Sequence, residues 1–108
     1  MNRPAAPLVQ HFRAPLRKIA DGHYTASVTW LRLDWLVTVT PNLMIRVGSG
    51  VANDPFELVA PLSRFEWGYG ATAEMAGFPY VLAMMRTADG WAVELWSEAA
   101  KLVTTPEP

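Results

Sequence analysis

The sequence predicts a mainly β domain, built as a small antiparallel barrel or sandwich with one or two short helices. Apolar and polar residues alternate with period two over several short stretches, as they do in strands with one buried face. Turn-forming residues separate these stretches at short, regular intervals, which is typical of antiparallel sheets. An α+β fold with an antiparallel sheet is the alternative.

The N-terminal segment gives mixed signals. Residues 1–7 contain two prolines and predict a flexible leader. Apolar residues over 8–19 follow helical spacing, but Pro15 is incompatible with a continuous helix because it lacks a backbone donor. We therefore expect a short helix or irregular arm over 8–14.

Three turn signals predict hairpins. Glycine, asparagine, aspartate and proline favour the tight turns that join antiparallel strands. Between Trp30 and Leu31 the apolar residues change parity, which predicts a bulge, bend or strand break. The turns and the strands that they join are Asp21-Gly22 between 16–20 and 23–30, Pro41-Asn42 between 35–40 and 43–47, and Ala88-Asp89-Gly90 between 80–86 and 91–96.

The remaining segments complete the predicted domain. Glycine and proline predict a loop over 48–55, and Pro61 separates two further strands. Capping residues predict a helical turn and a C-terminal helix. The expected segments are strands over 56–60 and 64–69, a helical turn over 72–76, a helix over 97–103 and a frayed tail over 104–108.

Composition bounds the class of protein. The 108 residues predict a single domain over 1–108. The absence of cysteine excludes disulfides and thiolate metal sites, and it fits a reducing cytoplasm. We expect a cytoplasmic protein, because the sequence has neither a signal-peptide pattern nor an apolar run long enough to span a membrane.

Catalytic and metal-binding patterns are missing. His11 and His23 are the only imidazoles, and Asp21 is the one carboxylate close to His23 in the sequence. No nucleophile motif accompanies them, and their spacing fits no metal site. We therefore predict no catalytic residues, no metal site and no cofactor, and we lean against an enzyme.

Aromatic residues carry the leading functional hypothesis. Five tryptophans are many for the inner face of one small sheet, and Trp35 and Trp96 are expected to point away from the face of their neighbours. Adjacent apolar pairs such as Met84-Met85 require strands that are apolar on both faces. The sequence therefore favours a non-enzymatic protein-interaction module that uses an aromatic and methionine-rich sheet surface. Its partner would be another protein or, as a homodimer, a second copy of the chain.

The alternative hypothesis is a small-molecule-binding protein or small enzyme. A pocket at the mouth of a curled sheet would be lined by aromatic side chains, with charged groups to orient the ligand. Glu66 and Glu94 would form an acid/base pair if they faced each other there. The expected lining is Trp67, Tyr69, Trp91 and Trp96, with Arg64, Glu66 and Glu94 as the polar groups.

The third hypothesis is nucleic-acid binding through a basic arm. Residues 1–20 carry a charge of +4 and the remaining residues carry −5, so the net charge of −1 hides an uneven distribution. Arg13, Arg17 and Lys18 would contact phosphates. The acidic body makes this the weakest of the three hypotheses.

Overall fold

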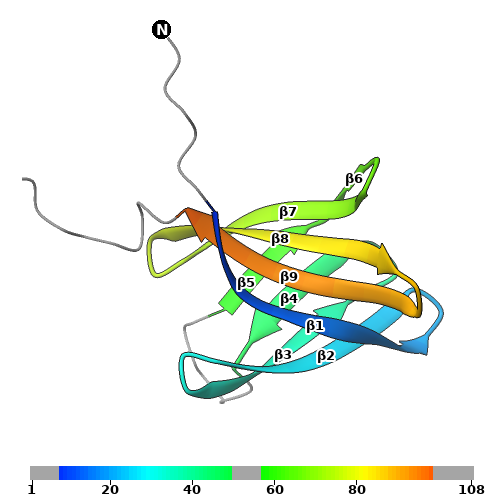
Figure 1. Cartoon of the computed structure of the whole chain (residues 1–108), viewed down its shortest axis with the longest axis horizontal. Coiled ribbons are helices and arrows are strands. Elements are labelled where there is room, and N and C mark those ends of the chain that lie inside the picture. Colours follow the sequence, from blue (N-terminus) through cyan, green and yellow to red (C-terminus); the bar gives the residue numbers. More distant parts are fainter. Residues whose placement is uncertain (1–7, 50–56, 99–108) are drawn as a thin grey trace, which may run out of the picture.

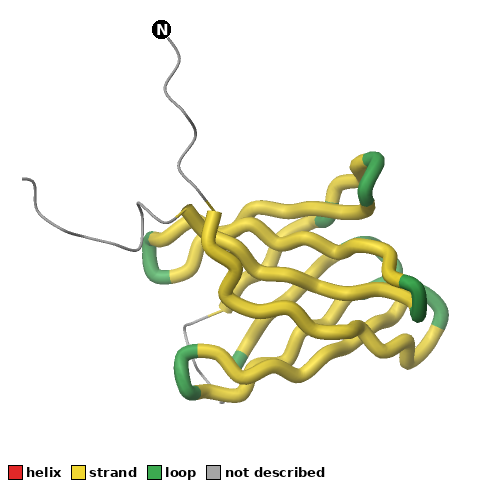
Figure 2. Tube along the Cα trace, viewed as in Figure 1, coloured by secondary structure: helices red, strands yellow, loops and turns green. Residues whose placement is uncertain are grey.

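The computed structural model describes residues 8–49 and 57–98, and every regular element in these ranges is a β-strand (Figure 1, Figure 2). Each strand pairs with its neighbours in the antiparallel sense. These ranges contain no helix of the length and apolarity needed to cross a membrane. The strands are β1 (Leu8–Ala20), β2 (His23–Trp30), β3 (Leu33–Val39), β4 (Met44–Gly48), β5 (Glu57–Pro61), β6 (Ser63–Phe65), β7 (Gly68–Met75), β8 (Phe78–Thr87) and β9 (Gly90–Glu98).

One continuous sheet curls into a nearly closed barrel. Its strand order is β5-β4-β3-β2-β1-β9-β8-β7-β6, and β5 contacts β7 on the side opposite β1. The long strand β1 joins the two halves, because residues 8–16 pair with β9 and residues 17–20 pair with β2 (Figure 1). The predicted mainly β fold, a small antiparallel barrel, is confirmed.

Alternating side chains fill the space between the two halves. Every described strand except β6 contributes inward-facing residues, so the core draws on eight of the nine described strands. Pro15 lies in the part of β1 that pairs with β9, opposite Ala92, whereas pairing with β2 begins only at Arg17. A proline is tolerated there because one edge of the strand has no partner and needs no backbone donor. The side chains at the centre of the core are Val37, Val39, Ile45, Val47, Leu58, Leu82, Val93 and Leu95.

The predicted helices are wrong within the described residues. Residues 8–14 belong to β1 and residues 72–76 fall mostly in β7, while Ser97 and Glu98 extend β9. The helical spacing in β1 arises from a register shift between Gln10 and Phe12, which inserts one extra residue and changes the inward-facing parity. Residues 1–7, 50–55 of the predicted loop, 99–103 and 104–108 lie outside the described ranges.

The three predicted hairpins and the predicted break near Trp30 are confirmed, and one further turn interrupts a predicted strand. The break near Trp30 is a hairpin turn at Leu31 and Arg32, both with positive φ (55° and 62°). The predicted strand over 64–69 is interrupted by a turn at Glu66 and Trp67, so β6 and β7 form a short hairpin. Residues 66 and 67 therefore lie at its tip.

Candidate functional site

Across β7, β8, β9 and β1, the centre of the outer face is apolar on β8 and β9 apart from Glu94, where an exposed sheet would carry polar groups. Cross-strand pairing places Gly70, Ala83, Glu94 and Arg13 in one row across these four strands. On β8 and β9, the residues next to Ala83 and Glu94 point inward and belong to the core. Ala83 and Glu94 are buried as well, so these two strands have buried residues on both faces. The small side chains in the row leave space above them.

That space is an apolar hollow of about 270 Å³, which we call the outer groove. Its floor is β8 and β9, and Trp96 forms one wall while Trp67 from the β6–β7 turn forms another. Glu94 is the only charged residue in the lining. The lining residues are Leu8, Trp67, Val81, Ala83, Met85, Glu94 and Trp96.

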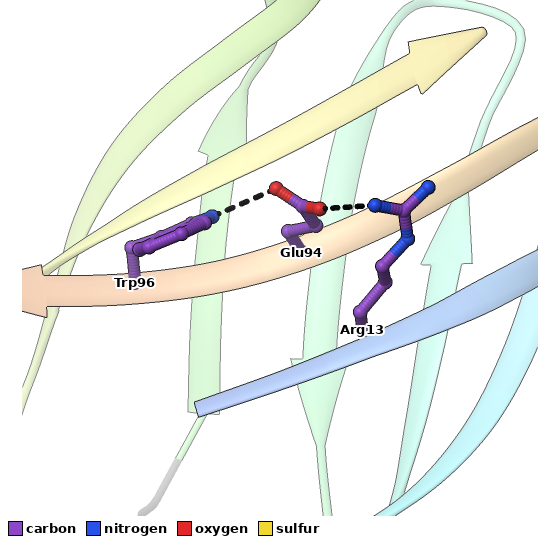
Figure 3. A network of polar contacts seen from close by, with 3 residues as sticks. All are labelled: Arg13, Glu94 and Trp96. Atoms are coloured by element: carbon purple, nitrogen blue, oxygen red, sulfur yellow. Dashed lines mark hydrogen bonds and ion pairs between the residues drawn. The ribbon is translucent and has the colours of Figure 1, made fainter. Parts of the chain in front are cut away.

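Glu94 is a buried carboxylate whose two oxygens are both engaged (Figure 3). Arg13 Nη1 donates to Oε2 over 3.0 Å, and Trp96 Nε1 donates to Oε1 over 2.9 Å. These bonds compensate the desolvation of the carboxylate and fix the indole of Trp96 as a wall of the groove. The geometry makes Glu94 a positioning group for Trp96, while Glu66 lines a different hollow.

The hairpin of β6 and β7 presents a stacked aromatic pair. The Phe65 and Trp67 rings lie parallel, with centroids 5.2 Å apart, and each residue is 49% exposed. Gly70 lies beneath them, where an added Cβ would come within 3.1 Å of both rings. Gly68 has φ of +147°, and a Cβ there would collide with the carbonyl oxygen of Met84. Two glycines therefore set the position of the aromatic pair.

A second hollow, of about 310 Å³, lies at the mouth of the barrel, and we call it the mouth groove. It contains five residues of the sequence-predicted pocket, Trp91 among them, and Arg86 joins them. The Arg86 guanidinium lies 5.1 Å from the Trp91 ring centroid, and the Tyr69 ring lies 5.8 Å from the same indole. Its charged and aromatic lining residues are Arg64, Phe65, Glu66, Trp67, Tyr69, Arg86 and Trp91.

Apart from Trp35, the predicted binding residues thus fall into two adjoining grooves, with Trp67 lining both. Trp96 and Glu94 belong to the outer groove, whereas Arg64, Glu66 and Tyr69 belong to the mouth groove. The sequence-based interpretation grouped them together because it treated 64–69 as one strand.

Trp35 lies in the core. Its side chain is only 2% exposed, and its indole nitrogen donates to the backbone oxygen of Trp30 over 2.6 Å. The indole packs at 5.1 Å from the Trp30 ring, so both side chains fill the same part of the barrel. The expectation that Trp35 points away from the core is therefore wrong, because the turn at Leu31 and Arg32 resets the parity of β3.

The predicted basic arm is part of the sheet. Arg13 pairs with Glu94, and Lys18 pairs with Asp21 over 3.4 Å at the β1–β2 turn. Arg17 is exposed on the same strand. Two of these three cations are therefore matched by carboxylates within the described chain.

His11 is a core-edge residue that sequence reasoning placed in no site. The register shift in β1 turns its ring toward Trp30 and Tyr80, with centroid distances of 5.4 and 5.6 Å. Its Nε2 forms a 2.6 Å hydrogen bond with the Ser97 hydroxyl, and burial lowers the pKa of the imidazole below 6.5. Ser97 is 1% exposed and no described carboxylate contacts His11, so this pair is structural.

A third hollow, of about 250 Å³, lies at the opposite end of the barrel between the β2–β3 and β7–β8 turns. Its apolar rim includes Leu31, Leu33 and Phe78. No residue with a charged side chain lines it. It therefore offers no charged group to orient a ligand.

The described residues contain no group of three or more His, Asp or Glu side chains that could hold a metal ion. Fold and site together define a small antiparallel β-barrel domain with an apolar groove on its outer face and a cationic, aromatic groove at its mouth. Comparisons with protein families, with curated proteins and with solved structures found no match to this chain.

Proposed function

We propose that this domain is a non-enzymatic protein-interaction module that associates with a second copy of itself through the outer groove. The observation that carries the proposal is that the outer groove on β8 and β9 is lined by Val81, Met85 and Trp96, apolar side chains that the fold leaves partly exposed. An apolar hollow in an outer sheet face is characteristic of a protein contact surface.

The second copy is favoured because a projection and a hollow of matching chemistry lie side by side. Trp67 lines the outer groove and projects from it, stacked on Phe65. A twofold axis beside Trp67 would bring each indole against the partner's groove, so that one patch supplies both halves of the contact. Exposed tryptophans beside apolar hollows are the usual anchors of protein interfaces.

Charge placement supports the same proposal. Glu94 on the groove floor is already paired, so covering the groove would leave no unpaired carboxylate. Arg13, whose side chain is 52% exposed, reaches the rim, where it can remain hydrated. A cytoplasmic location stays a prediction from composition.

Sedimentation equilibrium of the full chain tests the proposal directly, over protein concentrations up to about 0.5 mM and at low and moderate salt. We expect a dimer whose dissociation constant changes little with salt, because the contact is apolar. Trp67→Ser and Val81→Lys should each yield a monomer, since one removes the projection and the other places a charge in the groove.

Phe78→Ser is the matched control. Phe78 is 40% exposed and lies on the far hollow, so its loss removes a comparable apolar surface elsewhere. A monomer at all concentrations would refute self-association, and a dimer that Phe78→Ser disrupts while Trp67→Ser does not would move the interface to the opposite end of the barrel.

A further inference from the structure

The mouth groove concentrates hydrogen-bond donors that have no partner within the described chain. Arg64 and Arg86 both line it, and neither forms an ion pair with a described residue. The indole N–H groups of Trp67 and Trp91 add further donors. Glu66 is the only carboxylate in the lining, so the groove carries an excess of one positive charge.

The cations and aromatic rings are matched across the strands. Arg64 is the direct cross-strand partner of Tyr69, and Arg86 is the direct partner of Trp91. Tyr69 and Trp91 in turn pack against each other. Two arginine–aromatic pairs therefore border one hollow, where flat apolar surface and guanidinium groups lie within reach of a single small ligand.

We propose that the mouth groove binds a small planar anion, that is, an aromatic ring carrying a carboxylate or phosphate group. The ring would pack on the Tyr69 and Trp91 surfaces, and the anionic group would accept hydrogen bonds from the arginine forks. A guanidinium is suited to this role because its planar donors match both anions in bidentate fashion. The volume of about 310 Å³ is at the lower end for ligand pockets, which fits a single ring system.

This inference is independent of self-association. The groove opens at the mouth of the barrel, whereas the proposed dimer contact is the outer face of β8 and β9. Trp67 lines both grooves, so variants of Trp67 would not separate the two proposals. Arg64 and Arg86 line the mouth groove but not the outer groove, and they are the residues to change.

Nuclear magnetic resonance of the five indole N–H groups in the full chain provides the test. The Trp91 signal is assigned with Trp91→Phe, and four probes are titrated: AMP, benzoate, adenosine and inorganic phosphate. We expect AMP, benzoate or both to shift the Trp91 signal saturably. Adenosine lacks the charge and phosphate lacks the ring, so each should bind at least about tenfold more weakly than the matching probe.

Arginine variants connect the binding to the groove. Arg64→Gln and Arg86→Gln should each weaken binding of the active probe about tenfold or more. Arg17→Gln removes an exposed arginine of β1 outside the groove and should leave affinity unchanged. Unchanged indole signals of Trp30, Trp35 and Trp96, which do not line the mouth groove, would establish in the absence of probe that the variants fold.

Three results would overturn the proposal. One is the absence of a saturable Trp91 shift with AMP or benzoate up to about 10 mM. Another is a loss of affinity in Arg17→Gln equal to that in Arg64→Gln and Arg86→Gln, which would mean that the probe is attracted by the overall charge and not by the groove. The third is adenosine binding as tightly as AMP, which would leave the arginines without a role. A preference for AMP over benzoate, or the reverse, would support the proposal and identify the anionic group.

Discussion

Glu94 and Arg13 face each other directly across β9 and β1, and their 3.0 Å hydrogen bond joins residues 81 positions apart in the chain. The two ends of the pair differ in environment: the Glu94 side chain is 6% exposed, whereas that of Arg13 is 52% exposed. The buried charge of Glu94 is therefore stabilised mainly by its hydrogen-bond partners, whereas the exposed Arg13 guanidinium can be hydrated by solvent even without Glu94.

Arg13→Ala should lower the free energy of unfolding by about 1–3 kcal/mol, because it leaves a buried carboxylate with the Trp96 N–H as its only described donor. Glu94→Gln in the Arg13→Ala background should restore part of this loss, since a neutral amide needs no counter-charge. Urea unfolding at one fixed protein concentration measures both effects. Arg17→Ala is the control, and an equal loss in that variant would argue against the pair.

Acidification should destabilise the protein through His11. Burial lowers the pKa of His11 in the folded state, so below pH 6.5 the unfolded chain binds the proton first. The contribution of His11 is constant above 6.5 and becomes progressively unfavourable as the pH falls toward the lowered folded-state pKa. Unfolding curves between about pH 7.5 and 5 should show a steeper loss for the wild type than for His11→Gln.

The His11 ring itself gives a direct check on this pH dependence. Its Cε1 proton should titrate below 6.5 in the folded protein. Titration at or above that value would contradict the prediction, and so would equal pH slopes in the wild type and His11→Gln.

Two substitutions in the β2–β3 turn are expected to stabilise the folded protein. Leu31 and Arg32 both adopt positive φ, a conformation that costs L-residues roughly 1–2 kcal/mol each and that favours Asn-Gly. Leu31→Asn combined with Arg32→Gly should raise the free energy of unfolding by about 1 kcal/mol after the entropic cost of glycine. Thermal unfolding reports the gain.

The control for this prediction is a glycine introduced in another turn, at a residue whose φ is not positive. Ala88 in the β8–β9 turn lacks positive φ, so Ala88→Gly should lower stability by about 0.4–1 kcal/mol. If both changes moved stability in the same direction, backbone strain at Leu31 and Arg32 would not be the cause.

Gly68 should tolerate no side chain. Gly68→Ala would place a Cβ against the Met84 carbonyl at φ of +147°, and we expect a loss of at least about 2 kcal/mol in unfolding free energy. Gly77→Ala is the matched control, because its φ of +83° also favours glycine but nothing lies within 4 Å of the added Cβ. Similar losses in the two variants would show that contact with Met84 carries no weight.

The sequence predicted the fold where local chemistry and tertiary structure agree. Asp21-Gly22, Pro41-Asn42 and Ala88-Asp89-Gly90 contain residues suited to tight turns, and each lies at a hairpin. Leu31-Arg32 forms a turn with side chains that disfavour it, so sequence indicated only a break in parity there. The helical spacing in 8–19 is produced by one inserted residue at His11, which no local rule locates.

The candidate site was predicted only in part, because it depends on cross-strand neighbours. Trp67 and Trp96 were predicted from their residue type, and both line the outer groove. The pairing of Glu94 with Arg13 joins the two ends of the chain and leaves no mark in local sequence. Arg86 was missed because a charged residue near a hairpin end is ordinary, and only its position over Trp91 gives it significance.

The pairing of β1 with both β2 and β9 sets an order for assembly during synthesis. β2 follows β1 after a two-residue turn, whereas β9 is the last of the described strands in chain order. At a synthesis rate of roughly 5–20 residues per second, a few seconds pass between the completion of β5 and the synthesis of the remaining strands that cover Trp30 and Trp35. We expect the nascent chain to expose this aromatic surface throughout that interval.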